Sequence, residues 1–422
     1  MNHTLQAQAR RHVALLAVAQ ALLLTVVVGC MAVSGLAGQL LAPDVSLATL
    51  PIAALVVGPF LVSWPAALLM ERHGRRWGFW AGAGLCAAGA LVSALGAGRR
   101  DFWVFCLGHL LLGGFQGFGS YHRFAAMEAA TEEGRERAMS WVIGGGVVAA
   151  LAGPALAHAT RALGPVDFTG AYLAMAALSL AYALVVGQVR LAKPTGTVAG
   201  MHRGRPLVEI LRTGGAGKAM VTAASAYAVM VLAMTATPLV MVNCGLGAAD
   251  ARSVIQWHVL GMFVPSFFTG RLLQRFQAER VALAGVVLLS LHVAIAVSGL
   301  ALWQFGSSLV LLGVGWNFAF LGGTALLAQT HRPQERAKVQ ACNELIVAGV
   351  SAFASLSSGW LLHRLGWQQL NLVLLVPLVV ASITLLPAVR RAKPSAAAAV
   401  APAASGRHPQ YLGWCAGVRP AE

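Results

Sequence analysis

Charged side chains are scarce in this chain of 422 residues. Asp, Glu, Lys and Arg together make up 10% of it, while 58% of the residues are hydrophobic. A soluble domain usually carries about 25% charged residues, because its surface must stay hydrated. So few charges are tolerated only where the surrounding solvent is hydrocarbon. The composition therefore excludes an ordinary soluble protein and predicts one that lies in a lipid bilayer.

Acidic residues are scarcer than basic ones. There are 14 Asp and Glu and 30 Lys and Arg, which gives a net charge of +16. Such an excess can indicate a nucleic-acid partner. Here, however, the basic residues form short clusters between long apolar runs, without the interleaved aromatic side chains of nucleic-acid grooves. We therefore expect no nucleic-acid partner.

Familiar catalytic and metal motifs are also missing. The six cysteines show no CxxC spacing, so neither a zinc site nor a disulfide framework is indicated. The chain has no HExxH, no Walker A lysine motif and no GxSxG serine elbow. The first apolar run is too long for the core of a cleavable signal peptide. We expect no enzyme and no permanently bound cofactor.

What the sequence does contain is a series of twelve apolar segments, each long enough to span about 30 Å of hydrocarbon. Their centres lie near Val27, Val57, Gly84, Gly114, Val148, Leu178, Met230, Phe263, Leu289, Gly315, Phe353 and Val376. The prediction is an all-α membrane protein with twelve transmembrane helices.

The chain repeats itself at an interval of about 200 residues. LLMERHGRR at Leu68–Arg76 is matched by LLQRF at Leu272–Phe276, and one Glu-Arg-Ala triplet begins at Glu136 and another at Glu335. Such a repeat predicts two parallel six-helix halves. We place the halves at residues 1–190 and 218–390, with a cytoplasmic linker at 191–217 and a disordered cytoplasmic tail at 391–422.

The basic residues also predict the orientation of the chain. With the N-terminus inside, only Arg99, Arg100, Arg161, Arg252 and Arg364 of the thirty Lys and Arg fall on the outer side. Loops rich in Lys and Arg stay in the cytoplasm. We therefore expect both termini to be cytoplasmic.

The loop after the second segment resembles a signature of the major facilitator superfamily, G-x-L-A-D-R-x-G-R-R. The corresponding stretch is ALLMERHGRR, in which Ala67 replaces the glycine and Glu71 the aspartate. The resemblance implies a gating loop that pairs across the cytoplasmic helix ends and holds the outward-open state. Its residues would be Glu71, Arg72, Gly74, Arg75 and Arg76.

Two four-residue motifs carry the candidate chemistry. Met230 and Met234 lie one turn apart in segment seven, and His258 and Met262 lie one turn apart in segment eight. Around the short loop Asn243–Arg252, the two segments run antiparallel, so Met234 should face His258 and Met230 should face Met262. Thioethers and an imidazole suit Cu(I) and are poor ligands for Mg²⁺ or Ca²⁺. The competing interpretation is that these methionines only fill the helix packing.

An MxxxM motif followed by HxxxM resembles the CcoA-type copper importers of the major facilitator superfamily. The surrounding segments MTATPLVM, IQWHVLGMFVPSFFTGRLLQRF, GVGWNFAFLGGTALL and HRPQERAKVQACNELIV resemble that family too. The resemblance implies copper binding at Met230, Met234, His258 and Met262, and supply of copper for assembly of cbb3-type cytochrome c oxidase. RfnT-type riboflavin importers belong to the same wider family, so the resemblance leaves the cargo open.

Other polar or sulfur-containing residues have weaker claims. Cys244 and Met241 are possible accessory ligands at the outer mouth. Asn317 either lines the cavity or bonds across helices. Arg123 and Glu128 are interpreted as gate or loop anchors. Three further histidines have no partner motif and are expected to serve packing or cavity polarity: His109, His158 and His292.

Three functions remain open at this point. The first is copper import across the bacterial inner membrane by alternating access, with the copper ion as substrate, the lipid bilayer as surroundings and a monomer as the working unit. In the second, the cargo is riboflavin or another organic solute, bound by groups such as Trp316 and Asn317. The third is a copper sensor or scaffold that transports nothing. No acidic residue lies deep in a segment, because Glu128 and Glu344 fall near the cytoplasmic ends.

Overall fold

The protein is seen here as a computed structural model that describes residues 2–44, 47, 50–164, 166–191, 204–213 and 215–391. Every regular element within these ranges is helical. In hydrocarbon, backbone N–H and C=O groups need partners within the protein, and a helix supplies them inside a single segment. The predicted all-helical fold class is confirmed.

The first half of the chain forms one bundle. Its elements are α1 (Asn2–Leu41), α2 (Leu50–His73), α3 (Arg75–Arg99), α4 (Phe102–Gly119), α5 (His122–Ala129), the 3₁₀ helix η2 (Glu132–Gly134), α6 (Arg135–Gly144), α7 (Gly146–Thr160) and α8 (Thr169–Gly187).

A short helix in the linker, α9 (Leu207–Thr213), precedes the second bundle. The elements of that bundle are α10 (Ala216–Asn243), α11 (Ala248–Phe263), α12 (Ser266–Phe276), α13 (Ala278–Ser298), α14 (Leu302–Ala328), the 3₁₀ helix η4 (Pro333–Glu335), α15 (Arg336–Val373) and α16 (Leu375–Arg391). The predicted disordered tail lies outside the described residues from position 392 onward.

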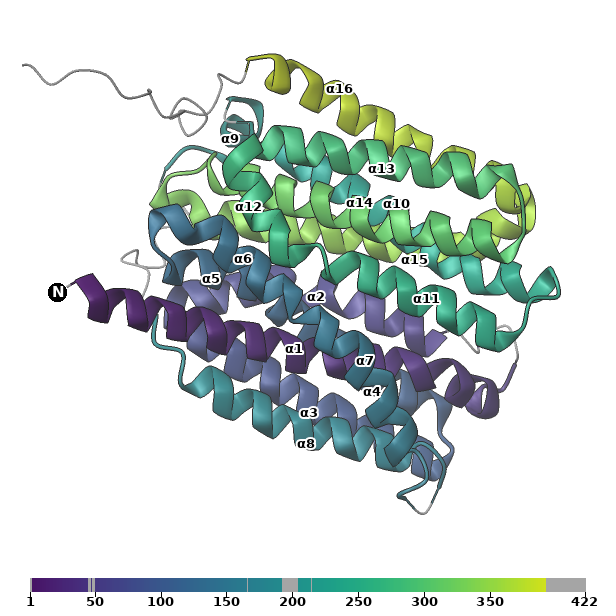
Figure 1. The fold of residues 1–422 in the computed structure, drawn as a ribbon. Helices are drawn as coiled ribbons and strands as arrows, with labels where there is room; N and C mark the ends of the chain where they lie inside the picture. The colour runs from purple at the N-terminus through teal and green to yellow at the C-terminus, as the bar shows by residue number, and fades with distance from the viewer. Residues whose placement is uncertain are drawn as a thin grey trace, which may run out of the picture.

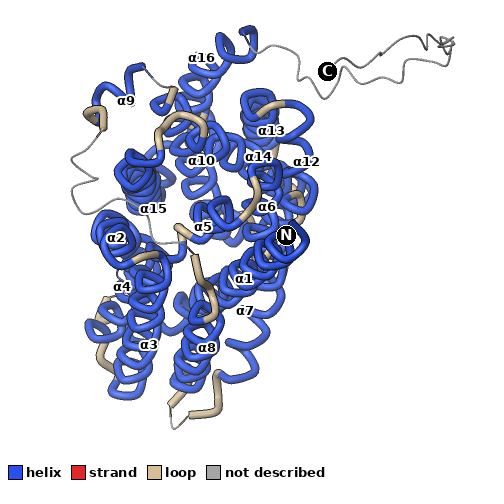
Figure 2. The backbone as a smooth tube through the Cα atoms, turned by 90° about the vertical axis from the view of Figure 1, so that its left-hand side faces the viewer, coloured by secondary structure: helices blue, strands red, loops and turns tan. Residues whose placement is uncertain are grey.

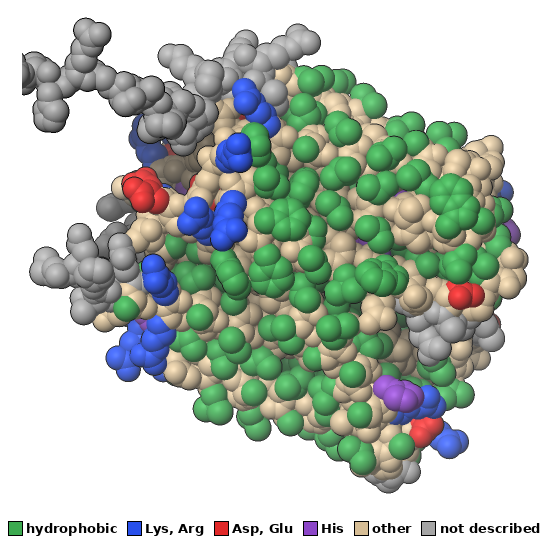
Figure 3. Space-filling model, viewed as in Figure 1, with side chains coloured by type: hydrophobic (Ala, Val, Ile, Leu, Met, Phe, Trp, Pro, Cys, Tyr) green, Lys and Arg blue, Asp and Glu red, His purple; other side chains and the backbone are tan. Residues whose placement is uncertain are grey.

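The two bundles lie side by side with their helices roughly parallel (Figure 1). They meet where α2 packs on α15 and where α6 packs on α12 (Figure 2). Several helices have their C-terminal ends at the same end of the molecule as the N-terminus and α9. They are α2, α5, α8, α12 and α14. Lys and Arg side chains gather there in the view of Figure 3, so we call it the basic end.

Ten stretches of the described chain are long and apolar enough to cross a membrane. The sequence predicts twelve, and two features account for the difference. The eighth segment is broken at Pro265 into α11 and α12, each shorter than a full span. The eleventh and twelfth segments run on as one stretch, Pro333–Leu386, which bends at Gly366. The fold therefore accommodates all twelve predicted segments.

Matching glycine contacts reveal the internal repeat in three dimensions. In the first bundle α2 approaches α4 at Gly58 and Gly113, and in the second α11 approaches α14 at Gly261 and Gly313. A Cβ on any of these glycines would press on the backbone of the neighbouring helix. Small residues at such crossings let membrane helices approach closely. Gly113 and Gly313 are 200 positions apart, which agrees with the repeat interval in the sequence.

The surface between the two ends is apolar. Large hydrophobic side chains there are widely exposed, among them Phe353 at 74%, Leu184 at 73% and Ile383 at 64%. Figure 3 shows hydrophobic side chains across the middle of this face, with charged side chains near its two ends. Such a band is stable only in lipid. The fold is that of a multi-pass membrane protein.

The end of the linker is fastened to the second bundle. Arg205 donates from its backbone N, Nε and Nη2 to the carboxylate of Glu335, at 3.1, 3.0 and 2.9 Å. Lys338 Nζ donates in turn to the Arg205 carbonyl at 2.6 Å. This part of the predicted linker is therefore bonded to the second half.

Candidate functional site

The two methionines of the predicted copper motif lie in the interior of α10. Met230 is buried, with 6% of its surface exposed, and Met234 is half-buried. Tyr227 lies one turn closer to the basic end on the same side of the helix. Both methionines thus lie in the middle of a helix that is long and apolar enough to cross a membrane.

His258 of α11 is fully buried and turns toward α14. Its Nδ1 donates to the carbonyl of Leu309 at 2.8 Å. Gly313 makes this contact possible, because a Cβ there would stand 2.5 Å from the His258 carbonyl oxygen. The other ring nitrogen, Nε2, is buried and has no hydrogen-bond partner.

This geometry bears on the predicted pairing of the two motifs. Met262 is buried in α11 one turn beyond His258. The one hydrogen bond of the His258 ring runs to α14 and not to α10, so the ring is anchored on a helix that carries neither motif. That Met234 faces His258 stays a prediction.

The side chain of Asn317 forms hydrogen bonds to neighbouring helices. Its Nδ2 donates to the Met262 carbonyl at 2.7 Å and to Ser266 Oγ at 2.6 Å, while Oδ1 accepts from Thr269 Oγ1 at 2.8 Å. These partners lie on both sides of the break at Pro265. Of the two roles considered for Asn317, the structure supports bonding across helices.

An aromatic cluster lies beside the motifs. Trp316 and Phe320 of α14 are stacked, with ring centroids 5.0 Å apart and planes at 17°. Tyr227 stands edge-on to both, at 5.3 and 5.0 Å, and Phe263 stands edge-on to Trp316 at 6.2 Å. The Nε1–H of Trp316 is buried without an acceptor. Flat aromatic faces next to an unused donor suit a planar ring that carries a carbonyl group.

An ion pair joins the two halves on the basic side of this cluster. Arg123 of α5 binds Glu344 of α15 through Nη2 and Oε1, and both side chains are 5% exposed. Asn343 also donates to Glu344 Oε1, at 2.7 Å. The Arg123 guanidinium lies 4.5 Å from the ring centroid of Phe320. Arg123 therefore contacts both the aromatic cluster and the opposite half.

The loop signature takes part in a second junction between the halves. Gly74 has a φ of +93°, a value that glycine adopts easily, and so separates α2 from α3. Arg75 then reaches Glu128 with Nη2 at 2.6 Å and Nε at 3.3 Å, and Gln340 of the other half with Nη2 at 2.7 Å. Arg336 approaches the same Glu128 carboxylate at 3.4 Å.

Several side-chain hydrogen bonds and ion pairs join the halves through the basic-end parts of the helices. Besides the two junctions above, Gln274 of α12 donates to the Glu133 carbonyl at 2.5 Å. These bonds seal the two bundles together at the basic end. That Arg75 belongs to a gating loop stays a prediction; Glu128 is its ion-pair partner, whereas Arg123 belongs to the separate pair with Glu344.

The remaining predicted residues fall in different surroundings. Met241 is fully buried in α10, which favours packing over ligand capture. Cys244 is an exposed free thiol just beyond the end of α10. In the described chain, no three His, Cys, Asp or Glu side chains come together in a way that could hold a metal ion.

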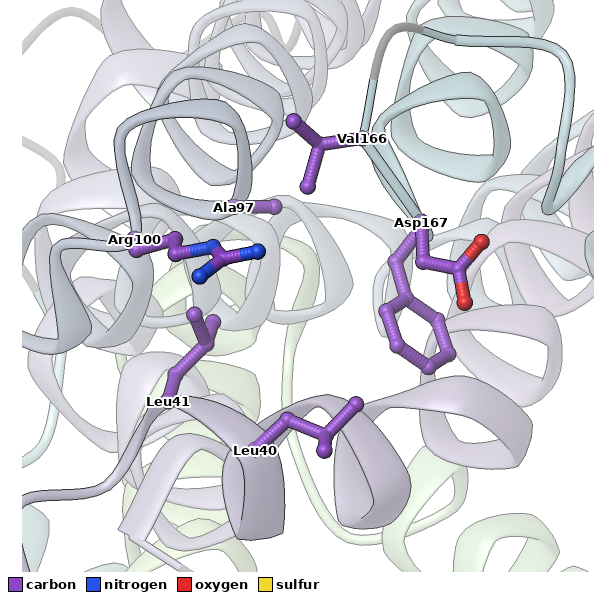
Figure 4. Close-up of a pocket in the computed structure, with 7 residues that line it drawn as sticks. Leu40, Leu41, Ala97, Arg100, Val166 and Asp167 are labelled. Atoms are coloured by element: carbon purple, nitrogen blue, oxygen red, sulfur yellow. The ribbon is translucent and has the colours of Figure 1, made fainter.

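A cavity of about 450 Å³ opens at the end of the first bundle opposite the basic end (Figure 4). Its lining residues are Leu40, Leu41, Ala97, Arg100, Val166, Asp167 and Phe168. None of these residues belongs to the motifs or to the aromatic cluster. The cavity is a crevice between helix ends, apart from the predicted site.

Sequence reasoning missed the importance of two residues. Glu344 was placed near a helix end, yet it forms a buried pair with Arg123, 221 positions away in sequence. His292, expected to serve packing or cavity polarity, leaves its Nε2 without a partner. The available signal was the same for both: a polar group within an apolar segment needs a partner or a function.

Comparisons with known proteins agree with this architecture. A family model described as the Major Facilitator Superfamily matches residues 219–414. The riboflavin transporter RfnT of Brucella anthropi is 40% identical over 395 residues, which cover 93% of this chain and 98% of that protein.

Solved structures of transporters are similar in fold. FucP in its outward conformation superposes with a TM-score of 0.70 at 15% identity, over 90% of this chain and 98% of that one. The human organic anion transporter MFSD10 gives 0.71 at 15% identity, over 89% and 99%. At this level of identity, the likeness concerns the fold alone.

Proposed function

The chain belongs to the major facilitator superfamily, and from that premise we propose that it imports riboflavin, or a planar solute of the same chemical class, by alternating access. The relative named for riboflavin transport is similar along nearly the whole chain. Copper import, the first expectation from the sequence motifs, becomes the second candidate.

The stacked aromatic cluster is the observation that carries this proposal. An isoalloxazine ring is flat and aromatic, and it presents carbonyl oxygens at its edge. Trp316 has a flat face, stacked on Phe320 in this conformation, and a buried Nε1–H without an acceptor. An unsatisfied buried donor costs about 1–3 kcal/mol, and a substrate carbonyl would recover that cost on binding. Stacking would add about 0.5–1.5 kcal/mol beyond the area buried.

Besides a binding site, alternating access requires bonds between the halves that can form and break. In the described conformation they close the basic end, which Arg123–Glu344 and Arg75–Gln340 hold together. Import requires these bonds to break once the substrate is bound, so that the halves rock about the site. We place the basic end in the cytoplasm, because Lys and Arg concentrate there. The protein would then work as a monomer in the bacterial inner membrane.

Copper import is the second candidate, favoured by one specific observation. The Nε2 atom of His258 is buried and unpartnered. With Nδ1 occupied by the Leu309 carbonyl, Nε2 is a bare lone pair in the neutral ring. A nitrogen in this state can bind a soft cation, with Met230, Met234 and Met262 as the predicted thioether ligands.

One experiment separates the two cargoes. Uptake of labelled riboflavin and accumulation of copper would be measured in the same cells, which lack their own importers for both. We expect riboflavin uptake with the wild type and its loss in Trp316→Leu. Trp303→Leu is the matched control on the same helix, because Trp303 is 66% exposed.

The copper candidate has its own variants in that experiment. Copper accumulation that disappears in both Met234→Ala and His258→Ala, at unchanged membrane abundance and without riboflavin uptake, would replace the riboflavin proposal by the copper one. Riboflavin uptake that survives Trp316→Leu would remove the aromatic cluster from the binding site.

A further inference from the structure

The two arginines that end the loop signature point in different directions. Arg75 reaches across the junction to Gln340 at 2.7 Å. Arg76 instead lies over the ring of Trp80, with its guanidinium carbon 4.4 Å from the ring centroid. Trp80 donates in turn from Nε1 to the Ala183 carbonyl of α8 at 3.2 Å. Arg76 is therefore placed where α3 packs on α8, inside the first half.

Two further arginines approach the same place from α1 and α8. Arg11 Nη2 donates to Gln188 Oε1 at 3.5 Å, just where α8 ends, and Arg190 follows two residues later and is exposed. A Cβ at Gly187, the residue before Gln188, would stand 3.6 Å from the Trp80 ring. The basic-end parts of α1, α3 and α8 thus bring one arginine each to a single corner (Figure 2). We call this cluster the arginine corner: Arg11, Arg76 and Arg190.

Ion pairs do not neutralise these charges within the described chain. The exposed ion pairs of the first half engage other arginines, such as Arg135 with Glu132. Among the described residues, no Asp or Glu forms an ion pair with a member of the arginine corner. Arg76 Nε is in addition buried without a hydrogen-bond acceptor. An anion bound at the corner would relieve the repulsion between its three charges.

The arginine corner borders the surface that faces lipid. Leu184 and Leu180 lie one and two turns before Gln188 on α8, and they are 73% and 66% exposed. Trp77 is 55% exposed and stands edge-on to Trp80 on α3, with ring centroids 5.2 Å apart. Tryptophan and arginine side chains at the end of an apolar band are typical of the membrane–water interface. A charged group at the corner would therefore have room for acyl chains along the exposed leucines.

We propose that the arginine corner binds the phosphate group of an anionic phospholipid from the leaflet at the basic end, with an acyl chain along Leu180 and Leu184. A guanidinium group matches phosphate oxygens with paired N–H donors. Basic pockets between transmembrane helices on the cytoplasmic side bind such headgroups. A soluble phosphate would contact the arginines alone, whereas the exposed leucines and Trp77 favour a lipid as the source. The bound lipid would hold the ends of α1, α3 and α8 together, whatever the cargo of the transporter.

The test is lipid retention by the purified full-length protein, measured by native mass spectrometry after equilibration in detergent with equal amounts of phosphatidylglycerol and phosphatidylcholine. We expect the wild type to prefer phosphatidylglycerol by at least fivefold. The preference should disappear in the triple variant in which Gln replaces all three arginines of the corner. The matched control is Arg271→Gln/Arg275→Gln/Arg280→Gln, which removes the same charge from exposed positions at the basic end of the second half and should keep the wild-type preference.

Photo-crosslinking of the wild type keeps the proposal testable even if the triple variant fails to fold. Phosphatidylglycerol with a photoreactive group near its phosphate should label peptides from the N-terminal part of α1, the start of α3 and the end of α8. Labels confined to α12 and α13, or no preference for phosphatidylglycerol in the wild type, would overturn the proposal. Equal losses in the two triple variants would overturn it too, because overall charge and not a site would then attract the lipid. Displacement of the lipid by inorganic phosphate would make a soluble anion the ligand instead.

Discussion

Arg123 of the first half packs its guanidinium against the ring of Phe320 in the second half, 4.5 Å from the ring centroid. The same ring is stacked with Trp316 at 5.0 Å. Arg123 also holds Glu344, so the aromatic cluster and the junction between the halves share one side chain. A solute that shifts Trp316 and Phe320 would therefore disturb the junction directly. This contact gives a physical route from substrate binding to opening of the basic end.

Glu344→Gln should weaken closure of the basic end. The variant leaves the Arg123 charge buried without a counter-charge, which typically costs about 3–5 kcal/mol. We expect a fall in uptake of more than tenfold at unchanged membrane abundance. Cys342, two residues before Glu344, is half-buried, and its alkylation, followed by mass spectrometry, should become faster as the junction opens.

Two further variants test whether charge pairing causes that effect. Arg123→Gln/Glu344→Gln removes both charges and should recover part of the lost stability, because no unpaired charge remains. Arg135→Gln breaks a pair with Glu132 that is 3.7 Å long and widely exposed, so it should change stability by less than about 1 kcal/mol. Wild-type uptake and Cys342 labelling in Glu344→Gln would contradict the gating role.

Comparison of Trp316→Phe with Trp316→Leu should separate the contribution of the N–H hydrogen bond to substrate binding from that of stacking. Phe keeps an aromatic face but removes the unpartnered N–H, whose hydrogen bond to a substrate would be worth about 0.5–1.5 kcal/mol. We expect KM for riboflavin to rise by up to about tenfold with little change in maximal rate. Leu also removes stacking and should raise KM further. Equal KM values for Phe and wild type would show that the N–H does not bind the substrate.

The sequence was sufficient for the fold because each segment is long, apolar and bounded by basic residues, so that hydropathy alone fixes its place. Hydropathy does not show the break in the eighth segment. Pro265 divides it into two helices, and Asn317 bonds the parts across the break. Periodicity within one segment cannot reveal a bond from another helix.

The candidate site was predictable only in part for the same reason. Helical spacing placed Met230 and Met234, and also His258 and Met262, on common faces of their helices. It could not show that the His258 ring is hydrogen-bonded to the Leu309 carbonyl, because that contact depends on how α11 crosses α14 at Gly261 and Gly313. The roles of residues such as His292 and Glu344 depend on neighbours that are far away in sequence.

Asn317→Ala should destabilise the second half. The variant removes three hydrogen bonds around the break at Pro265, to Met262, Ser266 and Thr269. At about 1 kcal/mol each, the expected loss is about 2–3 kcal/mol. Thermal unfolding of the purified protein would measure it. Asn243→Ala, at an exposed position at the end of α10, is the control and should change little. A melting temperature for Asn317→Ala equal to that of the wild type would refute the bonding role.

Gly313→Ala and Gly306→Ala compare a crowded glycine with an open one on the same helix. A Cβ at Gly313 would stand 2.5 Å from the His258 carbonyl oxygen and 2.8 Å from the Met262 nitrogen, whereas a Cβ at Gly306 would meet nothing within 4 Å. The methyl group of Gly313→Ala would push α11 away from α14. We expect this to destabilise the protein by about 1–3 kcal/mol and to lengthen the hydrogen bond from His258 to Leu309.

Gly306→Ala should instead be neutral or stabilise the protein by up to about 1 kcal/mol, because alanine favours the helix over glycine. Thermal unfolding of both variants gives this comparison. Equal melting temperatures for the two variants would mean that α11 yields without cost, and the close approach of α11 to α14 would not be what holds His258 in place.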